Sequence, residues 1–191
     1  TIPSVSTERI DLTDHDSVAK ALDRIQPDLI VHTAAATDVE WCEQNPENAK
    51  AINEDATISL AHKAEEHGAK FVYTSTDSVF DGKTGNYTEN DAPAPLNVYA
   101  RGKVRTEREV AKACPSALII RSYFYGHSPS GTRSLLEWVI ARVLVSDNVP
   151  GFTDSYFSPI GVRDFADALD AVLAINTTGL LHLGSRDSVS K

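Results

Sequence analysis

Apolar residues recur along the chain with two different periods, and their alternation predicts helices separated by buried strands. Helical spacing is clearest for Val18, Ala21, Leu22 and Ile25, in a run that Pro27 ends. Continuous apolar runs lie between such segments, and they are typical of strands that are buried on both faces of a parallel sheet. The pattern therefore predicts a βαβ succession.

The predicted elements follow one another without an internal repeat or a linker. A strand is expected to end at 10–12, and further strands are expected over 28–34, 70–76, 117–122 and 180–183, with an extended segment over 149–157. Helices are expected from the capping residues Thr13 and Asp14 to Ile25, over 46–67 with Gly68 at its end, from Tyr99 onward, over 135–144 and over 163–175. The connection over 77–98 is long and irregular, and such loops are usually functional.

This order of elements predicts an α/β fold with a doubly wound parallel sheet. In such sheets the ligand binds at the carboxyl ends of the strands. Ala34, Thr76 and Ser122 all lie at the ends of predicted strands. We therefore expect the functional site to lie around these three positions.

Composition narrows the class of protein. The 191 residues carry a net charge of −9 and no Lys/Arg stripe, which argues against a nucleic-acid or anionic-membrane partner. No signal peptide opens the chain, and no apolar run approaches the roughly 20 residues of a membrane span. The cysteines, Cys42 and Cys114, lie far apart and predict reduced thiols in a cytoplasmic protein. The histidines lack metal-ligand spacing, so no metal is expected.

A strand end and a helix start carry the candidate chemistry. Tyr99 and Lys103 are four residues apart, which places both on one helix face, where the ammonium can stabilise a phenolate. Such a tyrosine can donate a proton to a carbonyl oxygen while the hydroxyl of Thr76, or of Ser75, hydrogen-bonds the same oxygen. The same spacing arises by chance on exposed helix faces, but its strand–loop–helix context favours a reductase site.

Two further features leave alternatives open. Ala34, Ala35 and Ala36 end a strand with small side chains, which either pack closely against a helix or let a flat cofactor lie on the backbone. Asn53 interrupts a helical pattern, and it is either an exposed position or a buried amide that must be hydrogen-bonded.

The glycines do not form the G-x-G-x-x-G turn that normally holds a dinucleotide pyrophosphate. The chain also contains no methionine, and it begins at Thr1. We therefore expect the first βαβ unit to precede Thr1. We also expect these 191 residues alone to bind a dinucleotide weakly and to be inactive.

Taken together, the motifs resemble the extended short-chain dehydrogenase/reductases, and most closely the dTDP-4-dehydrorhamnose reductase-like sugar-nucleotide proteins. The resemblance is carried by Asp11-Leu12, 33–40, Pro46, Asn53, 75–82, 95–99, Lys103, Ser158-Pro159 and 162–164. It implies a Rossmann-like sheet whose first βαβ unit is missing, and a chain truncated at both ends. It divides the chain into a partial NAD(P)-binding domain over 1–148 and a small mixed substrate-binding lobe over 149–191, which are interleaved and effectively form one domain.

The resemblance also implies a set of site residues. The implied catalytic residues are Thr76, Tyr99, Lys103 and Asn53, with Tyr99 as the general acid. The implied cofactor contacts are Asp11 and Leu12 at the adenine, Ala34, Ala35 and Ala36 along the cofactor, Tyr99 and Lys103, and Ser122 and Tyr123 near the nicotinamide. The implied sugar contacts are Thr37, Val39 and Asp77.

The chain departs from the family pattern at several of these positions. Ala100 and Gly102 stand where the family usually has glycine and serine, and Ser78 stands where the rhamnose enzymes carry a tyrosine. The segment after Ser122 lacks their tryptophan. The resemblance therefore implies a reductase without fixing its sugar.

The leading hypothesis is an NAD(P)-dependent oxidoreductase that reduces a 4-keto-deoxysugar nucleotide, with NADPH favoured by the resemblance. The sequence leaves the oligomeric state open, with a homodimer among the alternatives. One alternative is a non-catalytic, NADP-binding regulatory subunit, as in the methionine adenosyltransferase β-subunits. Another is a sugar-nucleotide epimerase or dehydratase. Retention of Thr76, Tyr99 and Lys103 argues against a pure binding subunit.

Overall fold

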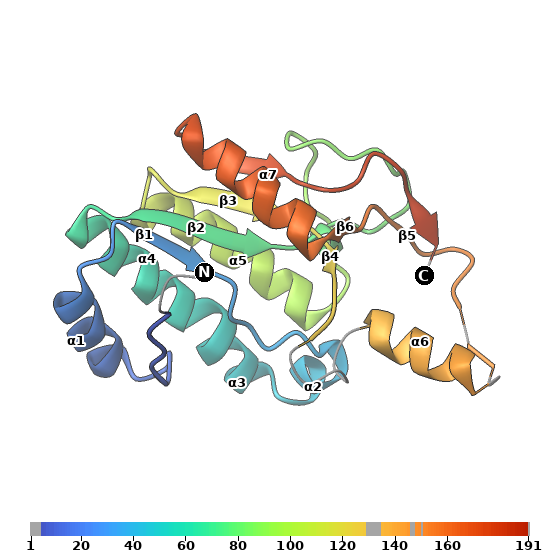
Figure 1. The fold of residues 1–191 in the computed structure, drawn as a ribbon, viewed down its shortest axis with the longest axis horizontal. Coiled ribbons are helices and arrows are strands. Elements are labelled where there is room, and N and C mark those ends of the chain that lie inside the picture. The colour runs from blue at the N-terminus through green and yellow to red at the C-terminus, as the bar shows by residue number, and fades with distance from the viewer. Residues whose placement is uncertain (1–4, 129–134, 146–147, 150, 191) are drawn as a thin grey trace. The chain divides into compact units, whose positions relative to one another are not determined.

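Short strands that pair in parallel form the sheet in the described part of the chain (Figure 1). The computed structural model describes residues 5–128, 135–145, 148–149 and 151–190. Strand β1 (Leu29–His32) pairs in parallel with β2 (Lys70–Ser75), and β3 (Leu118–Arg121) pairs in parallel with β7 (Gly179–His182). These pairs confirm the predicted α/β class and its parallel strands. No described helix combines the length and the hydrophobicity that crossing a bilayer requires.

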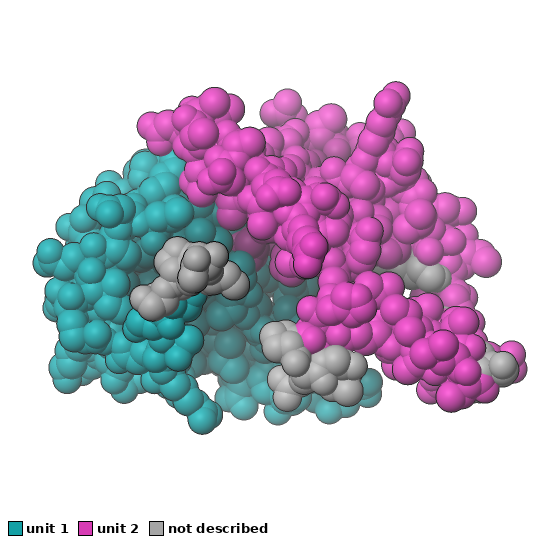
Figure 2. Space-filling view, viewed as in Figure 1, with its two compact units in different colours: residues 1–73, 97–117 teal, residues 74–96, 118–191 magenta. Residues whose placement is uncertain are grey.

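The chain forms two compact units, which Figure 2 shows in different colours. Unit 1 consists of 1–73 and 97–117, and unit 2 consists of 74–96 and 118–191. The division falls within β2, so Tyr73 belongs to unit 1 and Thr76 belongs to unit 2. Each unit is described separately.

Unit 1 packs helices against β1 and β2. Its helical segments are α1 (His15–Ile25), α2 (Val39–Gln44), α3 (Pro46–Lys50), the π-helix η1 (Ala51–Asp55), α4 (Ala56–His67) and α5 (Val98–Ala113). Helix α4 contacts both α1 and α5, and all three lie on the same side of β1 and β2 (Figure 1). The helices predicted to end at Ile25 and to span 46–67 are confirmed, and Gly68 ends the second at a left-handed φ of 67°.

Two predictions for unit 1 are wrong. The segment 10–12 is not a strand, because Asp11 turns the backbone by accepting hydrogen bonds from the amide and the hydroxyl of Thr13. Strand β1 is also not buried on both faces, since Leu29 and Val31 are 41% and 40% exposed. The reason is that β2 is the only described strand that pairs with β1.

Unit 2 combines the β3–β7 pair with a set of short elements. These are the 3-10 helix η2 (Asp77–Val79), β4 (Phe124–Tyr125), α6 (Leu135–Leu144), β5 (Tyr156–Phe157), β6 (Ile160–Gly161), α7 (Val162–Ala174) and β8 (Val189–Ser190). Helix α7 packs on the parallel β4–β6 pair, while β5 and β8 pair antiparallel. The helices predicted over 135–144 and 163–175 are therefore confirmed. Of the extended segment 149–157, only Tyr156 and Phe157 form a strand, and residue 150 lies outside the described residues.

Candidate active site

The start of α5 is held by two side chains that accept hydrogen bonds from its first amides. Asn97 Oδ1 accepts from the amide of Ala100 at 2.8 Å, and Glu43 Oε1 from α2 accepts from the amide of Val98 at 2.6 Å. The first amides of a helix lack partners within the helix, so these caps fix where the helix begins. Tyr99, in the first turn, is thereby fixed with it.

Lys103 lies one turn further along α5 and is only 4% exposed. Its Nζ lies 5.8 Å from the ring centre of Tyr99 and 4.7 Å from that of Tyr73. Burial lowers the pKa of Lys103 to about 8, against the opposing effect of Glu107. The structure therefore places a desolvated ammonium beside the Tyr99 ring, on the helix face that the spacing predicts.

Tyr73 is a site residue that the sequence reasoning missed. It lies on β2, fully buried, with its ring under the Lys103 ammonium, a cation–π arrangement. Burial raises its pKa well above 10, so its phenol stays neutral. In the sequence it stands in an apolar strand and is indistinguishable from an ordinary core aromatic.

Asn53 lies in the π-helix and is buried, with 4% of its surface exposed. Its Oδ1 accepts a hydrogen bond from the amide of Ala36 at 2.7 Å, and its Nδ2 donates to the carbonyl of Ala36 at 2.8 Å. This resolves the open alternative in favour of a buried, hydrogen-bonded amide. The pair of bonds anchors the small-residue segment after β1, in which Ala34 is exposed and Ala35 and Ala36 are half-buried.

His32 extends this network toward Lys103. Thr57 Oγ1 donates its hydrogen to the carbonyl of Asn53. His32 Nε2, which lies 2.9 Å from Thr57 Oγ1, must therefore donate to that hydroxyl oxygen. Burial, and then the charge of Lys103, lower the pKa of His32 to about 4. His32 is therefore a neutral hydrogen-bond donor near pH 7.

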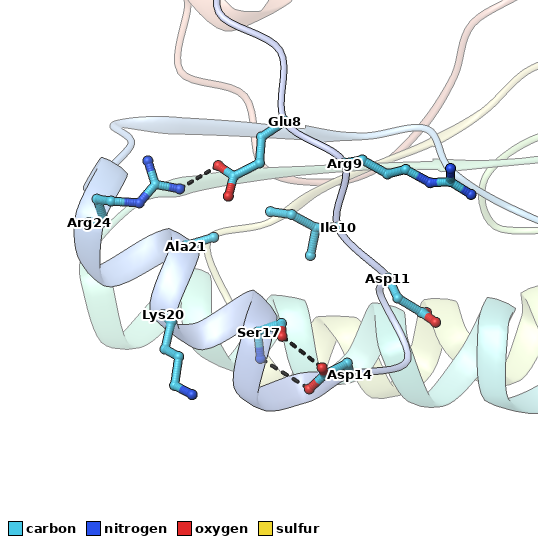
Figure 3. Close-up of a pocket in the computed structure, with 9 residues that line it drawn as sticks. All are labelled: Glu8, Arg9, Ile10, Asp11, Asp14, Ser17, Lys20, Ala21 and Arg24. Carbon is cyan, nitrogen blue, oxygen red and sulfur yellow. Dashed lines mark hydrogen bonds and ion pairs between the residues drawn. The ribbon is translucent and has the colours of Figure 1, made fainter.

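The residues expected at the adenine lie on the N-terminal segment of unit 1. Asp11 lines a pocket of about 400 Å³ together with residues of α1 (Figure 3). The hydrogen bonds from Thr13 lower its pKa. In Figure 3, Asp14 accepts hydrogen bonds from Ser17, and Arg24 forms an ion pair with Glu8. Leu12 and the Ala34–Ala36 segment do not line this pocket.

Unit 2 carries the other predicted hydroxyl. Thr76 is 6% exposed and caps η2, where its Oγ1 accepts from the amide of Ser78 and donates to Asp77 Oδ1. Tyr123 packs edge-on against Phe157 at 4.6 Å, and burial followed by the charge of Asp77 raises its pKa. The predicted residues Thr76, Asp77 and Tyr123 therefore belong to one unit.

Ser122 Oγ is buried and has no hydrogen-bond partner among the described residues. Buried hydroxyls nearly always have a partner, so an orphaned one is a group that a ligand can satisfy. The predicted sugar contacts Thr37 and Val39 lie in unit 1, exposed at the start of α2. The meeting of Thr76 with Tyr99 and Lys103, which lie in different units, stays a prediction.

The whole chain matches a known protein family. Residues 1–191 match the family model described as the RmlD substrate binding domain. The probable low-salt glycan biosynthesis reductase of Haloferax volcanii is 37% identical over 186 residues, which cover 95% of this chain and 62% of the relative. Methionine adenosyltransferase 2 subunit beta of Pongo abelii is 38% identical over 193 residues, which cover 96% of this chain and 57% of the relative.

A solved reductase structure is also similar to this chain. The dTDP-4-dehydrorhamnose reductase of Bacillus anthracis str. Ames, in complex with NADP, superposes with a TM-score of 0.88 at 28% identity, covering 95% of this chain and 64% of that chain. This similarity confirms the predicted Rossmann-like fold. The chain thus spans about 60% of the length of the curated relatives described above.

Proposed function

The chain belongs to the RmlD substrate binding domain family, and on that premise we propose that it acts in the NADPH-dependent reduction of a 4-keto-deoxysugar nucleotide. The observation that carries the proposal is the buried Lys103 ammonium beside Tyr99. A reductase relative at 37% identity and the likeness to an NADP-bound reductase support it. Proton transfer from a positioned side chain typically contributes about 10²–10⁴-fold to a rate.

The chemistry divides between the cofactor and the chain. Reduced nicotinamide would supply the hydride that adds to the carbonyl carbon. Tyr99 then donates its phenolic proton to the carbonyl oxygen, and the product is an alcohol. The phenolate that remains on Tyr99 is stabilised by the Lys103 ammonium, whose attraction is strengthened by its burial. Thr76 would orient the carbonyl oxygen through a hydrogen bond.

The remaining assignments follow the family resemblance. Ser122 fits a cofactor contact, because its orphaned hydroxyl is a hydrogen-bonding group that the described residues leave unsatisfied. We assign Asp11 and Leu12 to the adenine, Ala34–Ala36 and Tyr123 to the cofactor, and Thr37, Val39 and Asp77 to the sugar. Asn53 would act by anchoring Ala36. The proposed domains are 1–148 for the cofactor and 149–191 for the substrate.

A second candidate is a non-catalytic, NADP-binding regulatory subunit. The 38% identity to a methionine adenosyltransferase β-subunit favours it, as do the replacements at Ala100 and Gly102 inside the catalytic motif. A binding subunit does not require a desolvated lysine beside a tyrosine, which is why we prefer the reductase.

Cofactor consumption separates the candidates. The intact protein is incubated with NADPH and a panel of 4-keto-sugar nucleotides, and the loss of absorbance at the reduced nicotinamide band is followed. We expect net, stoichiometric oxidation with at least one of them. Tight NADPH binding without turnover across the panel would favour the regulatory subunit, and conversion of the sugar without net oxidation would favour an epimerase or dehydratase.

The state of the cysteines bears on the cellular setting that we propose. Cys42 and Cys114 are buried free thiols, which suits a reducing cytoplasm. A homodimer is the assembly we propose. Sedimentation of the intact protein at twice the mass of its chain supports this assembly, and sedimentation as a monomer contradicts it.

A further inference from the structure

The π-helix carries a buried carboxylate that the proposed reaction does not use. Glu54 is 6% exposed and pairs with Arg105 of α5. Arg105 Nε donates to Glu54 Oε2 at 2.8 Å, and Arg105 Nη2 donates to Glu54 Oε1 at 2.5 Å. Such a bidentate pair fixes both distance and orientation between two elements. The Glu54–Arg105 pair therefore ties the π-helix to α5.

Gly102 lets the Glu54 carboxylate lie close to the backbone of α5. A Cβ at position 102 would lie 3.0 Å from Glu54 Oε1, closer than most Cβ contacts, and 3.5 Å from its Cδ, an ordinary contact distance. Glycine in a helix interior is less favourable than alanine, and Gly102 lies well inside α5. The absence of a side chain at this position therefore has a local cause, which is room for the carboxylate.

The Glu54–Arg105 pair joins the π-helix to α5 next to the site residues of both elements. Asn53 directly precedes Glu54, and Lys103 directly follows Gly102. Thr106 Oγ1 adds a second link, since it lies 3.4 Å from the carbonyl of Asn53 while donating to the carbonyl of Gly102 at 2.9 Å. A π-turn inserts an extra residue into a helix and is often found at functional sites.

We propose that Glu54 and Arg105, closed over Gly102, are positioning residues that hold α5 in register with Asn53 and so keep Lys103 and Tyr99 in their reactive geometry. The inference rests on the proposed reductase function. Stability alone does not explain the arrangement, because Arg105 is half-exposed and ion pairs with a solvent-exposed partner contribute little to stability. A fixed geometry between two helices is what it provides.

Arg105→Gln is the direct test, because Arg105 is half-exposed and its loss leaves the Glu54 carboxylate buried without its cation. We expect kcat to fall by about tenfold or more with KM changed less than about threefold, since small misplacements of reacting groups are costly. The titration of Lys103, followed by NMR of its side chain, should move from about 8 toward 10.5 as water enters. Arg105→Lys, which keeps the charge, should recover part of the loss.

The matched control is Asp55→Asn, which breaks an ion pair on the same π-helix. Lys50 Nζ lies 2.8 Å from Asp55, and both side chains are about half exposed. We expect this variant to keep kcat and the Lys103 titration of the wild type. A fall in kcat equal to that of Arg105→Gln would show a general effect of the π-helix and would overturn the proposal.

A second test of the proposal substitutes Gly102 and leaves Arg105 in place. Gly102→Ala should lower kcat several-fold, because its Cβ displaces the held carboxylate. In a Glu54→Ala background the same change should add no further loss. Equal losses in both backgrounds would contradict the role of Glu54.

The proposed reaction and the positioning role of Glu54 and Arg105 can be refuted separately. If the wild type oxidises no NADPH with any sugar nucleotide, the proposed reaction is wrong, but the Lys103 titration still reports on the positioning. If the wild type turns over while Arg105→Gln matches it in kcat and in the Lys103 titration, only the positioning inference is wrong.

Discussion

The buried ammonium of Lys103 should make the stability of the protein depend on pH in the alkaline range. Its pKa is about 8 in the folded protein and 10.5 in its ordinary state, a difference worth about 3 kcal/mol. A lysine with a lowered folded pKa holds its proton more tightly in the unfolded chain. It therefore destabilises the fold below pH 8, and this penalty is relieved as the pH rises from 8 to 10.5.

Lys103→Met removes the titrating group and keeps a similar shape. The free energy of unfolding of the wild type, measured by urea denaturation, should gain about 3 kcal/mol on the variant between pH 7.5 and 10.5. The control is Lys50→Met, because Asp55 raises the pKa of the exposed Lys50 and no such gain is expected in this range. Parallel pH profiles for the wild type and Lys103→Met would refute the buried-ammonium reasoning.

Two further predictions concern His32 and the cap at the start of α5. The pKa of His32 is lowered from 6.5 to about 4, so the free energy of unfolding should be highest above pH 6.5 and should fall by about 3 kcal/mol as the pH drops to 4. Urea denaturation of His32→Gln should lack this loss at acid pH, and a loss equal to that of the wild type would contradict the prediction. Asn97→Ala removes the cap on α5 and should lower the free energy of unfolding by about 1 kcal/mol, whereas Asn97→Ser should keep most of it; equal losses in thermal unfolding would argue against the cap.

The Tyr99–Lys103 face could be predicted because helical periodicity alone decides it. The spacing of four residues holds in any regular α-helix, and α5 is regular from Val98 to Ala113. The burial of Asn53 could not be decided in the same way. The segment 46–67 contains a π-helix, and its extra residue shifts the face on which later side chains lie, so a single period does not describe it.

The other missing parts of the site depend on partners distant in sequence. The carboxylate of Glu54 is buried because Arg105 pairs with it, and these residues are 51 positions apart. Tyr73 stands in an apolar strand, and only the position of Lys103 gives its ring a role. Leu29 and Val31 show the opposite failure, because an apolar run predicts burial even where the structure leaves it exposed.

The proposed role of Tyr99 as the proton donor is tested most directly by the turnover of Tyr99→Phe. NADPH oxidation by the intact protein with its 4-keto-sugar nucleotide is compared for the two proteins, with NADPH affinity measured alongside. We predict that kcat falls by about 10²–10⁴-fold in Tyr99→Phe while NADPH affinity changes only a few-fold. Turnover of Tyr99→Phe within a few-fold of the wild type would contradict this role of Tyr99.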